Sequence, residues 1–581
     1  MVEPPWLAGY PPAIDWHAAI PVQPLPALFA QSARRFGPRP CLDFLGRRYS
    51  YADVERLIER AARGFQNLGV TKGARVGLFL PNCPQFVVAY FAILRAGGTV
   101  VTFSPLYAEA ELRHQVLDSG TEFMVTLNLT ALYPRAQALI GGTQLRRLVV
   151  GTLSEVLPFP KNFLHPIFHR REIAEIDGDA VRFSDLIADA TPPAPVAINP
   201  DTDIALLQYT GGTTGTPKGA MLTHANLSAN AHQALLWLDG VRWGEEKMLA
   251  VLPFFHVFAM TVAMNLALYV GAEIIIHPRF RLEDVLRDIH RKRPTLLPGV
   301  PTMYAAINSA DLRKFDLTSI RFCISGGAPL PVEVKQRFET LTGCKLVEGY
   351  GLTETAPVAT CNPLYGVNKA GSIGLPLPGT TVTITDRNDP SRVLGAGERG
   401  EICISGPQVM RGYWNRADET GAAIVDGRLR TGDIGYLDAQ GYVFLVDRIK
   451  DLILVGGFNV YPRVVEEAIY QHDAVVETIV IGIPDDYRGQ AVKAFVRVRD
   501  GARLTQAELL AFLESRVGRH EMPHEVEFRA ALPRTLVGKL SKKELVEEEL
   551  AKARVKSGAN VPATDAGADL ARGSPVADPA R

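Results

Sequence analysis

A segment rich in glycine and threonine, YTGGTTGTPKG at residues 209–219, lies at the end of the apolar run ALLQYT at 205–210. Glycines let backbone N–H groups approach an anion closely, and successive N–H groups form a concave anion site. Threonine hydroxyls add donors, and a lysine adds a positive charge. The pattern predicts a strand that leads directly into a polyphosphate-binding loop. The residues expected to contact phosphate are Thr210, Gly211, Gly212, Thr213, Thr214, Gly215 and Lys218.

This segment differs from the Walker A loop of P-loop NTPases. The Walker A motif has Ser or Thr directly after its lysine, whereas Gly219 follows Lys218 here. The sequence therefore predicts nucleotide binding on a fold other than the P-loop NTPase fold. The alternative interpretation is a surface turn that is rich in glycine and threonine.

Helical and strand patterns alternate along the first part of the chain. Residues 49–69 have apolar side chains at helical spacing, and the pattern stops at Gly69, an expected C-cap. Apolar strand runs at 75–82 and 100–105 flank a second helical pattern at 86–98. This alternation predicts βα units with parallel sheets.

A chain of 581 residues is too long for a single core. Short strands among Gly, Asp and Pro turns between residues 386 and 442 predict a small β-barrel or sheet module. The predicted fold class is α/β, with a large N-terminal domain of parallel-rich sheets, helices and this module, and a small α+β C-terminal domain on a hinge. The predicted divisions are an N-terminal extension (1–26), the large domain (27–447), the hinge (448–452), the C-terminal domain (453–550) and a disordered tail (551–581).

Charge and cysteine content exclude several classes of protein. Lys plus Arg and Asp plus Glu both number 62, so no overall field attracts nucleic acid. The six cysteines form no C-x-x-C pair, which argues against zinc and disulfides and favours a reducing cytoplasm. The first residues lack a signal-peptide pattern, and the most apolar stretch, 261–276, is too short to span a bilayer. We therefore expect a soluble cytoplasmic protein that does not bind nucleic acid.

Five motifs follow one another along the chain: YTGGTTGTPKGAMLTH (209–224), EGYGLTET (348–355), RTGDIG (430–435), DRIKDLILVGGFNVYP (447–462) and PRTLVGK (533–539). Together they resemble the enzymes that form acyl-adenylates, namely acyl- and aryl-CoA ligases, firefly-type luciferases and adenylation domains of nonribosomal peptide synthesis. The resemblance covers residues 28–549 and is strongest to bacterial long-chain fatty-acid CoA ligases. It implies that a carboxylate attacks the α-phosphorus of ATP and that pyrophosphate leaves.

The resemblance implies roles for polar residues around the nucleotide. Thr353 would contact the α-phosphate, and Glu354 would hold Mg²⁺ together with Thr213, because this cation favours carboxylate and phosphate oxygens. Asp433 would accept both ribose hydroxyls, and Arg448 would reach the ribose or the α-phosphate. Taken alone, Glu354 would be a solvated charge and Asp433 a turn cap.

Aromatic and glycine residues would complete the adenine site. Tyr350, between Gly349 and Gly351, would stack on the base. The resemblance places Gly326, Gly327 and Ala328, a short segment after a strand, where the purine and acyl pockets meet. The alternative for these three residues is an ordinary tight turn.

The resemblance implies that a lysine near the C-terminus stabilises the adenylation transition state. Lys539 occupies that position, with Leu536 where the family more often has Ser or Thr. Lys450 matches the hinge about which the C-terminal domain rotates between adenylation and thioester formation. Gly456, Gly457 and Phe458 would then line the pantetheine tunnel, although a hairpin turn also explains the two glycines.

Apolar segments favour a long fatty acid as the substrate. LPFFHVFAM at 252–260 and the apolar run to Val270 would form a pocket wall, because an acyl chain needs apolar lining. His256 would lie at this wall or gate it; a satisfied core histidine is the alternative. The segment LPFPKNFLHPIFHRRE at 157–172 mixes apolar and cationic residues and suggests contact with an anionic bilayer, with a buried connector as the alternative.

The expected small molecules are fatty acid, ATP, Mg²⁺ and CoA. Medium-chain or dicarboxylic acids, and a carrier protein in place of CoA, remain alternatives, and the protein is expected to be a monomer or a homodimer. A peripheral contact with the inner face of the cell membrane is a further hypothesis. A non-catalytic nucleotide-binding protein would be expected to lack Lys218, Glu354, Asp433 or Lys539, and all four are present.

Overall fold

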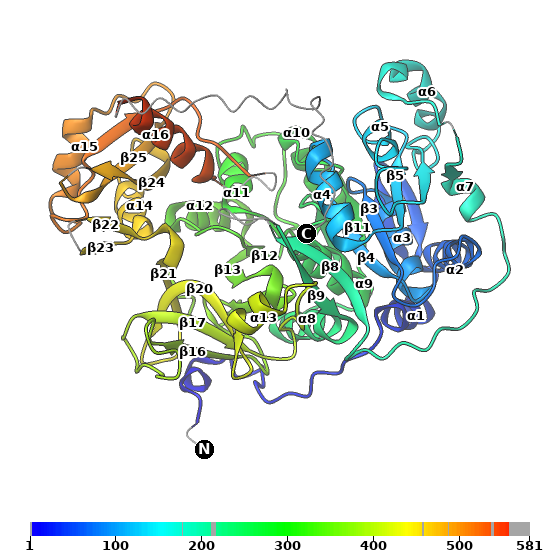
Figure 1. Cartoon of the computed structure of the whole chain (residues 1–581), viewed down its shortest axis with the longest axis horizontal. Coiled ribbons are helices and arrows are strands. Elements are labelled where there is room, and N and C mark those ends of the chain that lie inside the picture. The colour runs from blue at the N-terminus through cyan, green and yellow to red at the C-terminus, as the bar shows by residue number, and fades with distance from the viewer. Residues whose placement is uncertain are drawn as a thin grey trace, which may run out of the picture. The chain divides into compact units, whose positions relative to one another are not determined.

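The computed structural model describes residues 3–176, 178–210, 217–455, 458–485, 487–535 and 540–556, without the side chains of 554–556. It divides into two units (Figure 1). Unit 1 consists of Met1–Leu452 and Arg534–Leu540, and unit 2 consists of Ile453–Pro533 and Ser541–Arg581. The hinge assignment at 448–452 stays a prediction.

The largest sheet of unit 1 has eight strands in the order β18-β9-β8-β4-β3-β5-β6-β7. The pairings from β8 through β7 are parallel, whereas β9 runs antiparallel to both of its neighbours. The predicted parallel sheet is therefore present. Its strands are β3 (Arg75–Phe79), β4 (Thr99–Thr102), β5 (Phe123–Leu127), β6 (Arg147–Gly151), β7 (Val181–Arg182), β8 (Ile204–Thr210), β9 (Lys218–Thr223) and β18 (Gly412–Tyr413).

Two four-stranded sheets follow, in the orders β10-β11-β1-β2 and β12-β13-β14-β15. Leu296 joins them through parallel bridges to Met248 and Phe322. The strands are β1 (Pro40–Phe44), β2 (Arg47–Ser50), β10 (Lys247–Ala250), β11 (Glu273–Ile276), β12 (Phe322–Ser325), β13 (Lys345–Gly351), β14 (Val358–Cys361) and β15 (Leu375–Pro376).

The module predicted between residues 386 and 442 is an antiparallel sheet in the order β16-β17-β20-β19, with β21 also paired to β20. It has its own buried apolar cluster, which includes Val382, Ile402 and Ile404. Its strands are β16 (Thr381–Thr385), β17 (Gly400–Ser405), β19 (Ile424–Val425), β20 (Arg428–Leu437) and β21 (Val443–Arg448).

Helices complete unit 1, and α2 illustrates how the sequence specifies them. The Ser50 hydroxyl accepts the Asp53 N–H, and the Asp53 carboxylate accepts the Ser50 N–H, which forms a capping box. The helix buries Ile58 and Phe65, and Gly69 follows with φ +94°. The helices are α1 (Leu25–Phe36), α2 (Tyr51–Asn67), α3 (Pro84–Arg95), α4 (Glu109–Ser119), α5 (Tyr133–Gln137), α6 (Lys161–Phe168), α7 (Phe183–Leu186), α8 (His224–Trp237), α9 (Leu266–Tyr269), α10 (Leu282–Lys292), α11 (Pro301–Asn308), α12 (Val332–Thr342) and α13 (Ala417–Ala423).

Short helical segments lie between these elements. The 3₁₀ turns of unit 1 are η1 (Pro5–Gly9), η2 (Arg170–Glu172), η4 (Thr353–Thr355) and η5 (Ile449–Asp451), and η3 (Ala259–Asn265) is π-helical. Among the described residues, no helix combines the length and the apolar character needed to cross a membrane.

Unit 2 has a sheet in the order β23-β22-β25-β24, with β26 parallel to β25. Its separate apolar core includes Val460, Val465 and Leu509. The fold class predicted for the two parts is thus confirmed. The elements are β22 (Ile453–Val455), β23 (Phe458–Val460), β24 (Val475–Asp485), β25 (Gly489–Val498), β26 (Glu525–Phe528), α14 (Pro462–Tyr470), α15 (Gln506–Leu513) and α16 (Lys543–Lys556).

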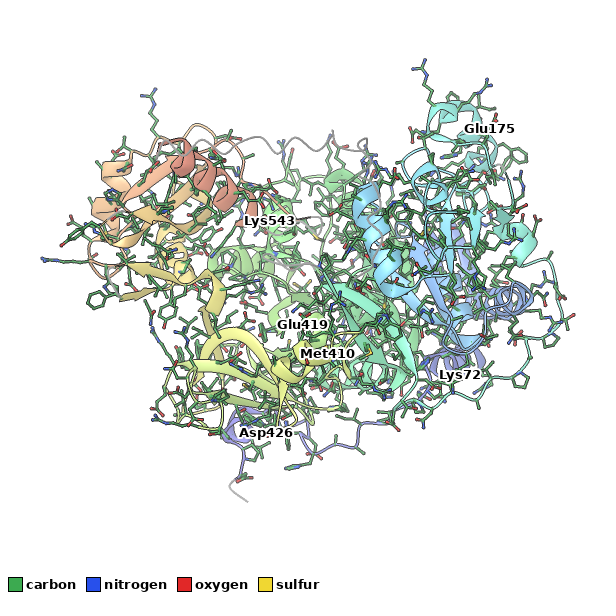
Figure 2. The ribbon with its side chains drawn as sticks, in the orientation of Figure 1. Lys72, Glu175, Met410, Glu419, Asp426 and Lys543 are labelled. Carbon is green, nitrogen blue, oxygen red and sulfur yellow. The ribbon has the colours of Figure 1, made fainter. Side chains whose placement is uncertain are left out.

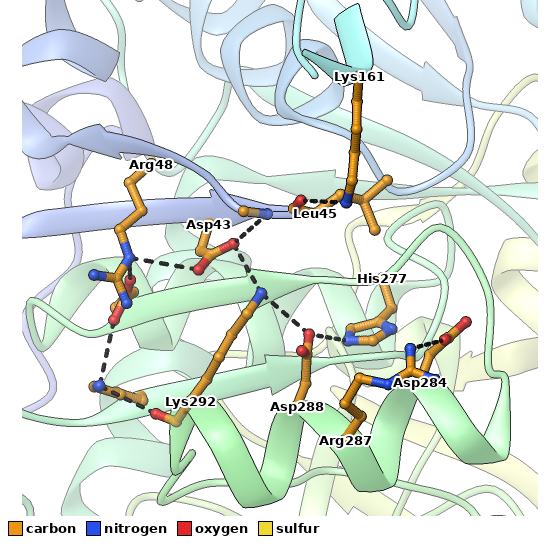
Figure 3. A network of polar contacts seen from close by, with 12 residues as sticks. Asp43, Leu45, Arg48, Lys161, His277, Asp284, Arg287, Asp288 and Lys292 are labelled. Atoms are coloured by element: carbon orange, nitrogen blue, oxygen red, sulfur yellow. Dashed lines mark hydrogen bonds and ion pairs between the residues drawn. The ribbon is translucent and has the colours of Figure 1, made fainter. Parts of the chain in front are cut away.

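A polar network joins the β1–β2 hairpin to α10 (Figure 3). Lys292 Nζ lies 2.9 Å from Asp43 Oδ1 and 3.1 Å from Asp288 Oδ2. Asp288 Oδ2 is also 2.9 Å from Nε2 of the buried His277. Burial alone would raise the pKa of Asp288, but the His277 contact and the Lys292 charge lower it overall.

Asp288→Asn should therefore lower the free energy of unfolding at pH 7 by about 1–3 kcal/mol, because the charge that faces His277 and Lys292 is lost. A carboxyl with a lowered folded-state pKa stabilises the protein above the unfolded-state pKa, and it loses that contribution as the pH falls through the folded-state value. The difference from wild type, measured by urea unfolding, should be full above about pH 5 and should shrink below the ordinary Asp pKa of 3.8.

Asp284→Asn on the same helix is the matched control. Asp284 is paired with Arg287 at 2.8 Å, and its side chain is 40% exposed, so its loss should cost less than about 1 kcal/mol. This account of the network would be contradicted if both substitutions lowered the free energy of unfolding equally. It would also be contradicted if the destabilisation by Asp288→Asn did not change with pH.

Candidate nucleotide and acyl site

The stem of the predicted phosphate loop is the antiparallel pair β8–β9. Thr210 lies opposite Lys218 at the open end of this pair, and the Thr210 hydroxyl is 3.5 Å from the Lys218 carbonyl oxygen. The pairing brings the two ends of the loop together. The predicted loop residues Gly211, Gly212, Thr213, Thr214 and Gly215 lie outside the described residues.

Lys218 and Glu354, which are 136 positions apart in the printed sequence, meet around one aromatic ring. The Tyr413 hydroxyl donates to Glu354 Oε1 at 2.7 Å, and Lys218 Nζ lies 5.2 Å from the centre of the Tyr413 ring. Burial, and then the Glu354 carboxylate, raise the pKa of Tyr413, so its hydroxyl stays protonated and acts as a donor. Tyr413 thus orients one predicted site residue and contacts another.

A second set of charges supports Lys218. Glu419, which projects from α13 and is labelled in Figure 2, forms an ion pair with Lys218. Arg416 contacts Glu419 at 3.5 Å and Asp118 at 2.7 Å, and Asp118 in turn accepts the Tyr209 hydroxyl at 2.6 Å. The chain of contacts connects α4, β8 and α13 at the base of the loop.

Sequence reasoning missed Tyr413, Glu419, Arg416 and Asp118. Tyr413 lies in the two-residue strand β18, whose pairing with β9 depends on tertiary structure. A strand of two residues has no period to detect, and isolated charges are usually solvated. Only the folded structure shows that these residues contact Lys218, Glu354 and Tyr209 or support those contacts.

Two other predicted residues, Tyr350 and Arg448, meet at Asp433, which is 2% exposed. Tyr350 donates its hydroxyl to Asp433 Oδ2 at 2.6 Å, and Arg448 Nε lies 3.1 Å from Oδ1. Burial and the Asp433 charge raise the pKa of Tyr350, and Asp433 also raises the pKa of Arg448. An ionised carboxylate only accepts hydrogen bonds and can serve several donors at once, which is the chemistry that ribose hydroxyls require.

Lys450 lies in η5, two residues after Arg448. Desolvation and the positive charge of Arg448 lower the pKa of Lys450, while the charges of Asp433 and Glu354 act in the opposite direction. The charge of Glu354 also raises the pKa of Arg448. Glu354, Asp433, Arg448 and Lys450 therefore share one electrostatic environment.

Close contacts explain two predicted glycines, one against backbone and one against an aromatic ring. A Cβ on Gly351 would lie 1.8 Å from the Pro357 carbonyl oxygen, and a Cβ on Gly326 would lie 3.0 Å from the Phe258 ring. The first contact places the end of β13 against the chain just after Thr353 and Glu354. Gly327 and Ala328 follow Gly326 at the end of β12, and Gly349 lies within β13.

His256 lies in the turn between β10 and η3, half-buried. Its Nδ1 is 3.3 Å from the Phe258 N–H, so the ring braces the turn that carries Phe258 toward Gly326. This contact fits both predictions for His256, a residue of the pocket wall and a satisfied histidine. Thr353 begins η4, and its carbonyl oxygen accepts the Ala356 N–H at 3.3 Å.

An apolar cavity of about 50 Å³ adjoins these elements. It lies among α8, η3, α9 and β12–β14, and Val262 and Leu266 belong to the apolar run predicted as a pocket wall. All of its described lining residues are apolar or sulfur-containing. They are Ala234, Leu238, Met248, Val262, Leu266, Leu296, Leu297, Pro298, Phe322, Cys323, Ile324, Val347, Val358, Cys361 and Leu364.

Metal ligands are sparse in the part of the chain that the structure describes, where no group of three or more His, Cys, Asp or Glu residues is placed to hold an ion. Mg²⁺ in nucleotide sites commonly takes one or two carboxylates, with phosphate oxygens and waters as its other ligands. Glu354 fits that pattern. The predicted residues Lys539, Gly456 and Gly457 lie outside the described residues.

Known proteins resemble this chain along most of its length. The AMP-binding enzyme family matches residues 29–414, and the AMP-binding enzyme C-terminal domain matches residues 464–539. A long-chain-fatty-acid–CoA ligase of Bacillus subtilis is 43% identical over 552 residues, which cover 94% of this chain and 98% of the relative. A long-chain-fatty-acid–CoA ligase of Yersinia pestis is 37% identical, with 94% and 99% covered.

A solved structure agrees with these matches. The crystal structure of ATP-bound MatB from Rhodopseudomonas palustris superimposes with a TM-score of 0.80 at 29% identity, covering 90% of this chain and 98% of that one. The predicted resemblance is confirmed, and the chain belongs to the AMP-binding enzyme family.

Proposed function

We propose that this protein is an ATP-dependent ligase that converts a long-chain fatty acid to acyl-AMP and then to acyl-CoA, releasing pyrophosphate and AMP. The single observation that carries the proposal is the similarity, over 94% of the chain, to relatives named long-chain-fatty-acid–CoA ligases. The grouping of Glu354, Asp433 and Arg448 in one environment supports it, because these are the residue types that a nucleotide and its metal require.

In this proposal, ATP lies along unit 1 from the Asp433 cluster to the loop. Asp433 and Arg448 hold the ribose, Tyr350 contacts adenine, and Thr353 faces the α-phosphate. Glu354 holds Mg²⁺, which neutralises charge on the phosphates when it is bound. Lys218 and Thr210, at the two ends of the loop, contact the leaving pyrophosphate.

The acyl chain occupies the apolar cavity beside β12 and η3. A volume of about 50 Å³ is below the roughly 300–1,000 Å³ of typical ligand pockets, so the lining must move to admit a long chain. The π-helical segment η3 supplies one wall, and such segments often mark functional sites. Apolar lining favours a monocarboxylic fatty acid over a dicarboxylic acid, whose second charge would need a buried partner.

The second half-reaction needs CoA and a different set of residues. Lys539 serves adenylation, Lys450 belongs to the hinge, and Gly456 and Gly457 serve thioester formation. We further propose a cytoplasmic protein, monomeric or homodimeric, that contacts the inner face of the cell membrane peripherally.

The reaction itself is the first test. With ATP, Mg²⁺ and CoA, long-chain acids should yield acyl-CoA and AMP in equal amounts, and chelation of Mg²⁺ should abolish both products. Each added methylene that is buried should raise kcat/KM by up to about fourfold until the pocket is full, since a buried methylene is worth about 0.8 kcal/mol. AMP without thioester would favour a carrier protein as the acceptor, and no AMP with any acid would leave a nucleotide-binding protein without this activity.

Lys539→Ala separates the two half-reactions. Loss of its charge at the transition state should slow adenylation at least about 100-fold. Conversion of supplied acyl-AMP and CoA to acyl-CoA should stay within about threefold of wild type. Lys543→Ala is the matched control, since Lys543 (Figure 2) is an exposed lysine on α16 and should leave both steps unchanged. Equal loss of both half-reactions in Lys539→Ala would overturn its assignment to adenylation.

Tyr413→Phe tests the contact between Tyr413 and Glu354. The variant keeps the ring near Lys218 but removes the hydroxyl that orients the Glu354 carboxylate, and a hydrogen bond to a charged group is worth about 1.5–3 kcal/mol. The kcat/KM for ATP should fall about tenfold or more, with a higher Mg²⁺ concentration needed for half-maximal activity.

Tyr365→Phe controls for the loss of a phenol at a partly exposed position away from this cluster, and it should behave as wild type. If Tyr413→Phe retained wild-type dependence on ATP and Mg²⁺, Glu354 would not depend on this hydrogen bond.

A further inference from the structure

Helix α6 and the residues before it expose an unusual number of large apolar side chains. Phe159, Phe163, Leu164, Ile167 and Phe168 are 81%, 67%, 42%, 69% and 76% exposed, and these five residues are called the α6 surface below. No residue of α6 is buried, so the buried-connector interpretation is wrong for α6; it holds for Leu157, the first residue of the predicted segment, which is buried. In Figure 1, α6 lies beyond α5 and α7 at the periphery of unit 1. Grouped exposed apolar residues mark interaction surfaces.

The polar side of α6 faces the protein. Lys161 Nζ donates to the Leu45 carbonyl oxygen at 3.3 Å, which ties the helix to the turn after β1 (Figure 3). The Asn162 Oδ1 and His165 Nδ1 atoms are shielded from solvent. A helix that packs on a core buries its apolar face and exposes its polar face. The orientation of α6 is the reverse, so its apolar face is available to a partner outside the described chain.

Positive charge accompanies the α6 surface. Arg170 and Arg171, which follow α6, are exposed, and no Asp or Glu occurs between Phe159 and Arg171. The next carboxylate, Glu172, contacts His169 Nδ1 at 3.0 Å. Apolar side chains beside cations match the chemistry of an anionic membrane surface, where the apolar groups enter the headgroup and acyl boundary and the cations face lipid phosphates.

We propose that the α6 surface docks unit 1 on an anionic lipid bilayer. Two copies of this chain are a poorer match, because a two-fold contact through the same patch would oppose cations to cations. The proposal rests on the proposed function for its purpose, since a long-chain fatty acid partitions into bilayers and would be taken from there. Its physical content, lipid binding through α6, stands independently of catalysis.

Sedimentation of the full chain with vesicles tests the proposal. Wild type should bind vesicles of 70% phosphatidylcholine and 30% phosphatidylglycerol more tightly than vesicles of phosphatidylcholine alone, and added salt should weaken the difference. The triple variant Phe163→Ser, Ile167→Ser, Phe168→Ser should bind at least about tenfold more weakly, because its apolar contacts are lost. The double variant Arg170→Gln, Arg171→Gln should lose about fivefold per arginine on anionic vesicles only.

Matched controls exist elsewhere on unit 1. Leu106→Ser and Val367→Ser remove apolar side chains that are 60% and 62% exposed, and Arg313→Gln removes a cation whose side chain is 87% exposed. These variants should bind vesicles like wild type. Thermal unfolding checks that every variant is folded.

Activity separates this proposal from the proposed function. The triple variant should keep wild-type kcat with fatty acid supplied in detergent micelles, and it should lose rate only with fatty acid supplied in anionic vesicles. The docking proposal would be overturned if wild type failed to sediment with either vesicle, or if the α6 variants sedimented like wild type. A change of oligomeric state in the triple variant, with unchanged vesicle binding, would assign the surface to a second copy instead. An inactive but vesicle-binding wild type would overturn the proposed function and leave the docking surface in place.

Discussion

The buried carboxylate of Asp433 is the constraint around which the proposed ribose side of the site is built. A charge that is 2% exposed is costly unless it is paired and hydrogen-bonded. Its partners come from β13 and β21, through the Tyr350 hydroxyl and the Arg448 guanidinium. The need to compensate one anion thus fixes β20, β21 and the end of β13 relative to one another, and it holds these side chains in place before any nucleotide arrives.

Much of the fold follows from local patterns. Helix α2 carries its own capping box and its own stop signal at Gly69, and β3 is a short apolar run that is buried in the centre of a parallel sheet. Motif residues such as Asp433, Arg448 and Tyr350 were also predictable together, because their motifs are continuous in sequence. Their grouping in the structure agrees with that prediction.

The remaining site residues depend on contacts between distant segments. Tyr413 reaches Glu354 only because a two-residue strand pairs with β9, and Asp118 joins Tyr209 only because α4 packs near β8. Neither residue has a local pattern that distinguishes it from a solvated side chain. The orientation of α6 was equally undetermined, since its composition suits either a buried connector or an exposed surface. The structure decides between them, because no residue of α6 is buried and Lys161 is anchored on Leu45.

The ion pair between Lys218 and Glu419 lowers the free energy that Lys218 could gain by binding a phosphate. A solvated lysine gains an ionic partner when it binds a phosphate. Lys218 already has the Glu419 carboxylate beside it, so a phosphate would replace that carboxylate. The net gain is then the difference between two similar attractions, so it is small. In the proposed function, such a site would favour a ligand with several phosphates over one with a single phosphate, and it would release pyrophosphate readily because Glu419 can pair with Lys218 again.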